Sequence, residues 1–440
     1  MMLLIKHGRI VDPGQNRDDY ADILIHQGTI VQLAPRIDPG TITGVAGGKS
    51  SDLQVVDASG TIVAPGFIDM HTHLREPGYE TKETIASGCR AAAAGGFTAV
   101  ACMPNTNPVN DNKVVTTYIR CRAQQEGCVR VYPIGAITRG LQGESLSDIG
   151  SLKAAGVVAL SDDGEPVMNS DLMRRALEYV KHFDLLVISH CEDKTLSAEG
   201  VMHEGLVSTR LGLPGIPSAA EDVMVARDVI LAEMTGSRLH VAHVSTAGAV
   251  DIIRRAKMRG VHVSAEATPH HFTLTDEAVT SFDTNTKVNP PLRSSADREA
   301  VRQALLDGTI DCIATDHAPH GTGDKDLEYG RAANGIAGLE TAVALTLSGL
   351  VHEAGMSINR AVTLLSTNPA RLLGVAGGTL QQGAAADITI LDLERESIVN
   401  PARFRSLSRN TPFGGRKLVG GPVMTIVDGT IVWEDHERAT

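Results

Sequence analysis

Short apolar runs alternate with longer amphipathic stretches through the middle of the chain. The runs are typical of buried strands, and the stretches repeat apolar residues with the period of a helix. Repeated strand–helix units predict a parallel sheet, and a series of eight predicts a closed (β/α)8 TIM barrel of the α/β class. The expected strands cover residues 67–73, 97–103, 129–137, 157–161, 185–190, 239–243, 261–266 and 310–316. The expected helices include 81–94, 171–181, 219–233, 247–258 and 295–306, with further helical pattern after the last strand.

The two ends of the chain share a different pattern. Apolar residues alternate with polar ones in short runs, and Gly, Pro, Asn or Asp interrupts each run, as in strands joined by turns. This pattern covers 3–14, 21–34, 53–66, 386–394 and 423–435. We therefore expect residues 1–62 and 375–440 to build one small β-sandwich together, and residues 63–374 to form the barrel.

Length, composition and charge narrow the class of protein. The 440 residues fit a barrel of roughly 250 to 320 residues plus one accessory module. A content of 42% hydrophobic and 21% charged residues is typical of a soluble globular chain. The formal net charge of -12 argues against nucleic acid as a partner, and no apolar stretch approaches the roughly 20 residues that span a bilayer. Six scattered cysteines without a CxxC pair indicate reduced thiols in a cytoplasmic protein.

Metal-binding residue types stand at the ends of the expected barrel strands. The first strand ends in His71-Thr72-His73, and alternation along a strand points both histidines to one face. Such a pair could hold a metal ion or be a buried structural pair. The other strand ends carry Asp162-Asp163, His190, His243 and Asp316.

The carboxyl ends of barrel strands form the active site in this fold, so these side chains are expected at one rim. Each one alone also fits a capping or loop-anchoring role, but together they predict a metal centre. Nitrogen and carboxylate ligands suit Zn²⁺, and six such groups exceed the needs of one tetrahedral ion. Two metals can share a bridging hydroxide and carboxylate, which predicts a hydrolase. Spacing alone does not choose between Asp162 and Asp163 as the bridge.

Eight segments carry a more specific pattern: GFIDMHTHLREPG, MPNTNP, LSDDG, SHCED, HVST, EATPHH, NPPLR and ATDHAPH. In this order, from Gly66 to beyond Glu340, they resemble the type I dihydroorotases of the amidohydrolase superfamily. The resemblance implies a zinc-dependent cyclic amidohydrolase. Its expected reaction is the reversible hydrolysis of the cyclic amide of dihydroorotate to N-carbamoyl-aspartate, in pyrimidine biosynthesis.

The resemblance also implies a role for each candidate ligand. His71 and His73 would hold the more buried zinc ion with Asp316, and His190 and His243 would hold the second. Asp163 and a hydroxide would bridge the two ions, because the fourth strand, VVALSDDG, lacks the lysine that hydantoinases carboxylate for this purpose. Asp162 would then be a loop group. Asp316 would be the general acid and base.

Substrate contacts follow from a carboxylate outside the substrate ring. Arg75, two residues beyond the HxH motif, can bind a carboxylate in bidentate fashion. The resemblance implies that Asn105 and His320 join Arg75 at this carboxylate and that His73 also contacts the substrate. It further implies that Asn289 and the backbone near Asn334-Gly335 contact the ring. The sequence departs from the family at RAANGIAGLET, where many relatives carry Pro-Phe-Gly before the Ile.

Two further segments are interpreted without a ligand role. His270-His271 lies after the seventh expected strand but is expected to support the site rather than bind metal. The charged, glycine-containing segment 321–329 is expected to be a mobile lid.

Two alternatives stay open at this point. The chain could act on another cyclic amide, like an allantoinase or dihydropyrimidinase. It could also be a non-catalytic dihydroorotase-like subunit that supports aspartate transcarbamoylase. The resemblance favours a homo-oligomer and names aspartate transcarbamoylase as a candidate partner besides the small-molecule substrate; neither nucleic acid nor membrane is expected.

Overall fold

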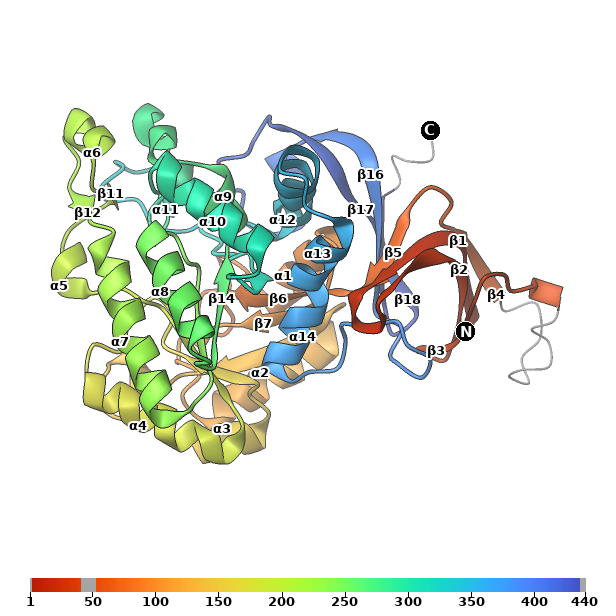
Figure 1. Cartoon of the computed structure of the whole chain (residues 1–440), viewed down its shortest axis with the longest axis horizontal. Coiled ribbons are helices and arrows are strands. Elements are labelled where there is room, and N and C mark those ends of the chain that lie inside the picture. The colour runs from red at the N-terminus through yellow and green to blue at the C-terminus, as the bar shows by residue number, and fades with distance from the viewer. Residues whose placement is uncertain (1, 41–52, 436–440) are drawn as a thin grey trace.

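A computed structural model describes residues 2–40 and 53–435. It has two parts, a barrel surrounded by helices and a β module that carries the N-terminus (Figure 1). Each expected barrel strand is confirmed. Within the described ranges, the barrel sheet has eight strands in chain order, each parallel to the next: β6 Phe67–Thr72, β7 Phe97–Cys102, β8 Arg130–Gly135, β9 Ala159–Ser161, β10 Leu186–Ser189, β13 Leu239–Val241, β14 Val263–Ala267 and β15 Cys312–Ile313.

The barrel closes between its first and last strands just beyond β15. Thr72 pairs with His317 in a parallel bridge, and the His73 N–H donates to the His317 carbonyl at 2.8 Å. The sequence expectation of a (β/α)8 barrel is therefore correct.

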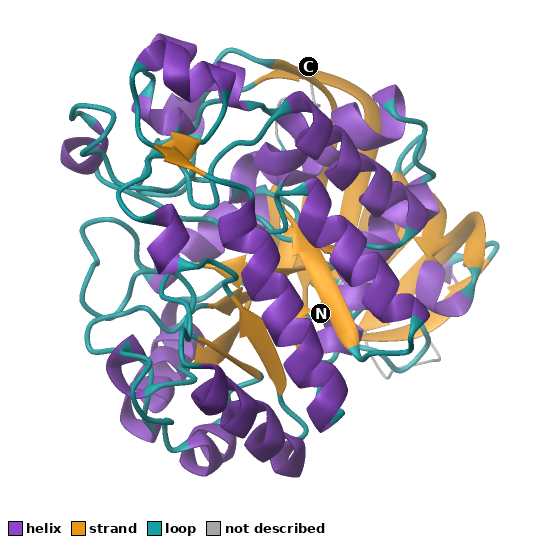
Figure 2. Cartoon of the chain, turned by 60° about the vertical axis from the view of Figure 1, so that its left-hand side comes forward, coloured by secondary structure: helices purple, strands orange, loops and turns teal. Residues whose placement is uncertain are grey.

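Helices cover the outside of the strands (Figure 2). The longer ones are α1 Ile85–Ala94, α2 Lys113–Glu126, α3 Ile149–Ala155, α4 Ser170–Val180, α7 Ala219–Thr235, α8 Ala247–Met258, α10 Ser295–Asp307 and α12 Leu339–Thr346. Side-chain caps define where several begin. The helix expected from residue 81 starts only at Ile85, because Thr84 Oγ1 accepts the Ser87 N–H at 3.1 Å. The shorter α-helices among the described residues are α5 Lys194–Ser197, α6 Leu206–Leu211, α9 Pro269–Thr273, α11 Thr322–Lys325, α13 Ile358–Val362 and α14 Asn368–Leu373.

The β module joins both ends of the chain, as expected. Its strands are β1 Met2–Asp12, β2 Arg17–His26, β3 Thr29–Ala34, β4 Leu53–Asp57, β5 Ile62–Pro65, β16 Ile388–Ile398, β17 Lys417–Val427 and β18 Thr430–Glu434. In the part of the chain that the structure describes, these strands hydrogen-bond into one continuous sheet, and antiparallel pairing of β5 with β16 links the two ends. Side chains of both ends share one apolar core, for example Ile23 and Ile426.

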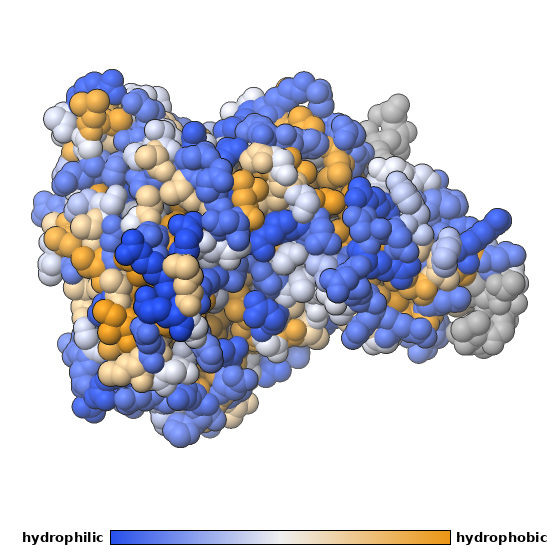
Figure 3. Space-filling model, in the orientation of Figure 1, coloured by the Kyte–Doolittle hydropathy of each residue, from blue (hydrophilic) through white to orange (hydrophobic). Residues whose placement is uncertain are grey.

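The expected domain boundaries stay a prediction. The hydrogen bonds of β5 to β16 carry the module's sheet to Pro65, a few residues beyond the expected boundary at 62. Residues 1, 41–52 and 436–440 of the expected module lie outside the described residues. The visible face of the molecule is mostly hydrophilic, with apolar side chains in separate patches (Figure 3). None of the described helices has the length and apolar character needed to cross a membrane.

Candidate active site

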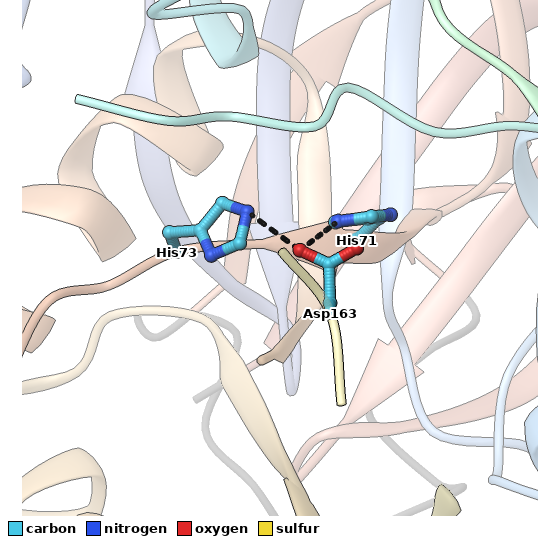
Figure 4. Close-up of side chains that lie close together, drawn as sticks. All are labelled: His71, His73 and Asp163. Carbon is cyan, nitrogen blue, oxygen red and sulfur yellow. Dashed lines mark ion pairs between the residues drawn. The ribbon is translucent and has the colours of Figure 1, made fainter. Parts of the chain in front are cut away.

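His71 and His73 lie at the carboxyl end of β6 and turn toward one carboxylate. Asp163, in the loop after β9, places Oδ2 3.3 Å from His71 Nε2 and 3.4 Å from His73 Nε2 (Figure 4). All three side chains are buried. The structure therefore brings the expected HxH pair together with the second of the two adjacent aspartates.

A second histidine pair faces the other oxygen of the same carboxylate. His190, after β10, and His243, after β13, have Nδ1 and Nε2 2.9 Å apart. Asp163 Oδ1 lies 3.6 Å from His190 Nδ1 and 3.3 Å from His243 Nε2. One carboxylate thus meets a histidine pair with each oxygen, which is the geometry that a ligand shared by two ions requires.

Asp316 follows β15 and joins the first histidine pair. Its Oδ1 lies 3.0 Å from His73 Nε2 and 3.4 Å from His71 Nε2. Its backbone is in the left-handed region, with φ of 46°, so the chain turns sharply here and directs the side chain to the centre.

The residues present fit metal ions. His71 Nε2 and Asp163 Oδ1 are buried polar atoms without a hydrogen-bond partner, and both face the centre, although buried polar atoms are normally satisfied. Burial lowers the pKa of His71, but the Asp163 and Asp316 carboxylates outweigh it and raise that pKa well above its usual value. Such a concentration of acceptors around imidazoles favours a cation at the centre. The donors are nitrogen and carboxylate oxygen, a set suited to zinc and similar divalent ions.

His71, His73 and His190 each have a polar partner at the ring nitrogen that points away from Asp163. His71 Nδ1 is 2.7 Å from Glu266 Oε1, His73 Nδ1 is 2.9 Å from Asn105 Oδ1, and His190 Nε2 is 3.0 Å from Glu192 Oε2. Such partners fix the ring orientation and leave the inner nitrogen for a metal. Sequence reasoning missed Glu266 and Glu192. Glu266 ends the seventh expected strand, so the strand-end rule could have found it.

A cavity of about 320 Å³ opens next to the centre. Its wall contains all seven expected substrate contacts, namely His73, Arg75, Asn105, Asn289, His320, Asn334 and Gly335. Asp163, His190 and Asp316 also face it, whereas His71 and His243 are not part of its wall. Sequence reasoning missed five lining residues, Gly164, Glu165, Lys194, Val288 and Ala318.

Arg75 and His320 form the cationic side of this cavity. Arg75 Nε donates to the Pro319 carbonyl at 3.2 Å, and its Nη2 lies 3.4 Å from His320 Nε2. Burial, followed by the charge of Arg75, lowers the pKa of His320 to about 3. His320 is therefore neutral near pH 7, and Arg75 supplies the positive charge.

Two expectations about neighbouring residues agree with the geometry. Asp162 accepts the N–H groups of Ile137 at 2.7 Å and Thr138 at 3.0 Å, which is a loop-anchoring role. His271 Nε2 lies 3.0 Å from the Pro290 carbonyl, and His270 is buried beside it. Neither histidine belongs to the two ligand groups found among the described residues.

The expected lid, 321–329, is tied to the neighbouring loops by a buried lysine. Lys325 Nζ donates to the carbonyls of Thr284 at 3.0 Å, Lys287 at 3.1 Å and Ala333 at 2.8 Å. Its movement stays a prediction.

Comparison with known proteins decides the family. A family model described as Dihydro-orotase-like matches residues 60–249, and one of the Amidohydrolase family matches residues 207–433. A dihydroorotase of Syntrophus aciditrophicus is 55% identical over 435 residues, covering 99% of this chain and 100% of that protein. A dihydroorotase of Pelotomaculum thermopropionicum is 57% identical over 436 residues, covering 99% of each chain. The chain belongs to the dihydroorotase family.

The resemblance expected from the motifs is therefore confirmed, and the chain is a hydrolase of the amidohydrolase type. Solved structures support the fold. The L-hydantoinase (dihydropyrimidinase) of Arthrobacter aurescens superposes with a TM-score of 0.86 at 26% identity, covering 98% of this chain and 96% of that one. A dihydropyrimidinase of Brevibacillus agri gives a TM-score of 0.84 at 23% identity, covering 99% and 95%.

Proposed function

We propose that this protein is a dihydroorotase, which reversibly hydrolyses the cyclic amide of (S)-dihydroorotate to N-carbamoyl-L-aspartate. One observation carries the proposal: the shared carboxylate Asp163, the acid Asp316 and the cation Arg75 border the same cavity. When the ring amide of the substrate lies at the centre, Arg75 can bind the carboxylate that the substrate carries outside the ring. Pyrimidine biosynthesis is the pathway that this reaction serves.

The proposed cofactor is Zn²⁺, two ions per chain. His71, His73 and Asp316 would hold one, His190 and His243 the other, and Asp163 both. Zinc in such a pair lowers the pKa of water to near 7 and polarises a carbonyl. The support is the arrangement of two histidine pairs on opposite oxygens of one carboxylate.

Asp316 is the proposed general base and general acid. In hydrolysis its carboxylate accepts the proton of the attacking water as the oxygen bonds to the amide carbon. It then donates this proton to the ring nitrogen as the carbon–nitrogen bond breaks, so the carboxylate is regenerated. Burial raises the pKa of Asp316, but the charge of His71 and the hydrogen bond to His73 outweigh this effect and hold that pKa below its usual value. It is therefore ionised before attack.

The remaining contacts bind and orient the substrate. Arg75, Asn105 and His320 would bind the carboxylate, whereas Asn289 and the backbone at Asn334-Gly335 would meet the ring. The neutral His320 ring has a single N–H, and its Nε2 lies 2.8 Å from the Asn334 carbonyl oxygen, so a bound carboxylate would replace that carbonyl as the acceptor. Asn105 also contacts two of the proposed metal ligands. Its Oδ1 orients His73, and its Nδ2 lies 3.5 Å from the backbone carbonyl oxygen of Asp163.

Other expectations go with this proposal. Association into a homo-oligomer and with aspartate transcarbamoylase stay predictions of the family resemblance. A cytoplasmic location is proposed because the six cysteines, all within the described residues, are free thiols.

The direct test supplies zinc-loaded protein with dihydroorotate and, at mildly acidic pH, with carbamoyl-aspartate. We expect turnover in both directions and none with dihydrouracil or allantoin, which lack the carboxylate outside the ring. Hydrolysis of dihydrouracil in preference to dihydroorotate would support the dihydropyrimidinase alternative. Zinc binding without turnover of any of these substrates would support the non-catalytic alternative.

A further inference from the structure

A segment of the β module reaches the rim of the barrel. Residues 405–411, which we call the strap, connect β16 to β17 but lie against barrel loops. The Arg405 N–H donates to Glu340 Oε1 at 2.7 Å, and Ser408 Oγ donates to the Lys82 carbonyl at 2.7 Å. The strap therefore crosses between the loop before α1 and the start of α12, beside the cavity.

Asn410 carries the strap's contacts with the substrate loops. Its side chain is buried, with a relative exposure of 4%. Its Nδ2 donates to the carbonyls of Ala318 and Gly335, both at 3.0 Å, and its Oδ1 accepts the His320 N–H at 3.1 Å. Its own carbonyl accepts the Ala337 N–H at 2.8 Å. One side chain thus joins two loops that are far apart from it in the sequence.

Both loops line the substrate cavity through His320 and Gly335. They are packed so closely that a Cβ on Gly335, whose φ is 145°, would lie 2.7 Å from the Ala318 carbonyl oxygen. The carbonyls of Ala318 and Gly335 both need a donor here, because a buried carbonyl that is left without one destabilises the folded chain. An amide side chain offers two donors and an acceptor, so it satisfies both carbonyls and the His320 N–H together.

We propose that Asn410 is a positioning residue through which the β module completes the substrate site. It holds His320 and Gly335 at the spacing that the carboxylate and ring of the substrate need. The module is then part of the binding site rather than an appendage of the barrel. The role of these loops in binding dihydroorotate rests on the proposed function, whereas the fixing of the loops by Asn410 does not.

The test compares Asn410→Ala with Asn368→Ala in the full zinc-loaded chain. Asn368 is a matched control, because its Nδ2 also donates to one backbone carbonyl, that of Asp311 at 2.8 Å, before β15 rather than at the rim. For Asn410→Ala we expect a KM for dihydroorotate raised 10-fold or more, kcat within threefold of wild type and unchanged zinc content. Hydrogen–deuterium exchange in residues 318–337 should become faster. Asn368→Ala should lower the melting temperature without either change.

Each outcome decides the inference. A wild-type KM or wild-type exchange rates in Asn410→Ala would overturn it, and so would an equal rise of KM in Asn368→Ala. If the wild type does not turn over dihydroorotate, the proposed function fails, and the exchange comparison alone decides the role of Asn410. Should Asn410→Ala not fold, Asn410→Ser replaces it, because its hydroxyl and a water can satisfy part of the freed groups; the same direction of change is expected.

Discussion

Single carboxylates in this centre each organise two or more partners. Asp163 meets one histidine pair with each oxygen. Glu266, fully buried, lies 2.7 Å from His71 and 3.1 Å from His240. Buried charges are retained only where they are paired and hydrogen-bonded. The loss of any one of them is therefore expected to disturb several groups, so the informative substitutions are those that remove a single role.

Asp316→Ala removes the proposed acid–base group and leaves five of the six proposed metal ligands in place. The two histidine pairs and Asp163 remain, so at least one zinc ion per chain should still bind. Activity should fall by roughly 10³-fold or more, because a positioned acid–base group contributes about 10²–10⁴ and one metal ligand is lost as well. Metal analysis and steady-state kinetics with dihydroorotate measure both effects. Activity near that of the wild type would place the proton transfer on another group.

Arg75→Met tests recognition of the substrate carboxylate. Methionine keeps a similar length but removes the charge, so KM for dihydroorotate should rise by about 10- to 100-fold, as expected for a charge-assisted hydrogen bond of about 1.5–3 kcal/mol. Zinc content should not change. Arg210→Met is the control, since Arg210 is exposed and pairs with Glu277 at 3.3 Å outside the site. Steady-state kinetics measure this change, and an unchanged KM for dihydroorotate would remove Arg75 from the binding site.

Some residues of the site could be predicted from the sequence, and others could not. Strand ends pointed to the histidines and to Asp316, because parallel strands of a barrel end at one rim. The spacing of residues did not show which of Asp162 and Asp163 is the shared metal ligand. In the structure, the turn after β9 directs Asp162 away from the centre, where it accepts the N–H groups of Ile137 and Thr138. The direction of each carboxylate depends on the backbone dihedral angles at these two adjacent residues, and a sequence pattern does not contain them.

At the scale of elements, short strands and irregular loops form the site. The eighth strand was expected over 310–316 but extends only over Cys312–Ile313. The left-handed backbone of Asp316 turns the chain out of the strand direction. Apolar runs predicted the existence of each strand, whereas its end was set by the turn that aims a side chain at the centre. The strap contacts were out of reach, because Asn410 and Ala318 meet only in the folded chain.

Docking of the strap to α12 gives stability a pH dependence. Burial raises the pKa of Glu340 to about 7, against the opposing hydrogen bonds from the strap N–H groups. Between about pH 4.5 and 7 the folded state then binds more protons than the unfolded state, so this group's contribution is fully present below pH 4.5 and is lost as the pH rises through 7. Over that window the free energy of unfolding of the wild type should fall relative to Glu340→Gln, by at most about 3 kcal/mol.

Urea unfolding of both proteins at several pH values measures this difference. Glutamine keeps an acceptor for the strap N–H groups but does not titrate, which makes it the matched variant. A difference between the two proteins that stays constant from pH 4.5 to 7.5 would contradict the assignment to Glu340.

At the scale of the whole molecule, a charged contact fastens the barrel to the β module. Arg130, at the start of β8, donates from Nε to Asp387 Oδ2 at 2.7 Å and also pairs with Asp428. Asp387 is nearly buried and accepts the Asp428 N–H at 2.9 Å, while its carbonyl accepts the Gly66 N–H. The contact links residues that are more than 250 positions apart. The sequence pattern of the barrel or of the β module alone therefore could not predict this ion pair.

Arg130→Met should weaken this junction. It leaves the Asp387 carboxylate without its main charged partner, and removing one side of a buried pair costs several kcal/mol. Because the Arg130 side chain is 29% exposed, water compensates part of the loss, and we expect a decrease of about 1–3 kcal/mol in the free energy of unfolding. Arg174→Met, which breaks only exposed pairs on α4, should cost within about 0.5 kcal/mol. Equal losses in the two variants would mean that the junction relies on apolar packing instead, whereas a loss confined to Arg130→Met, with zinc content unchanged, assigns it to the charged contact.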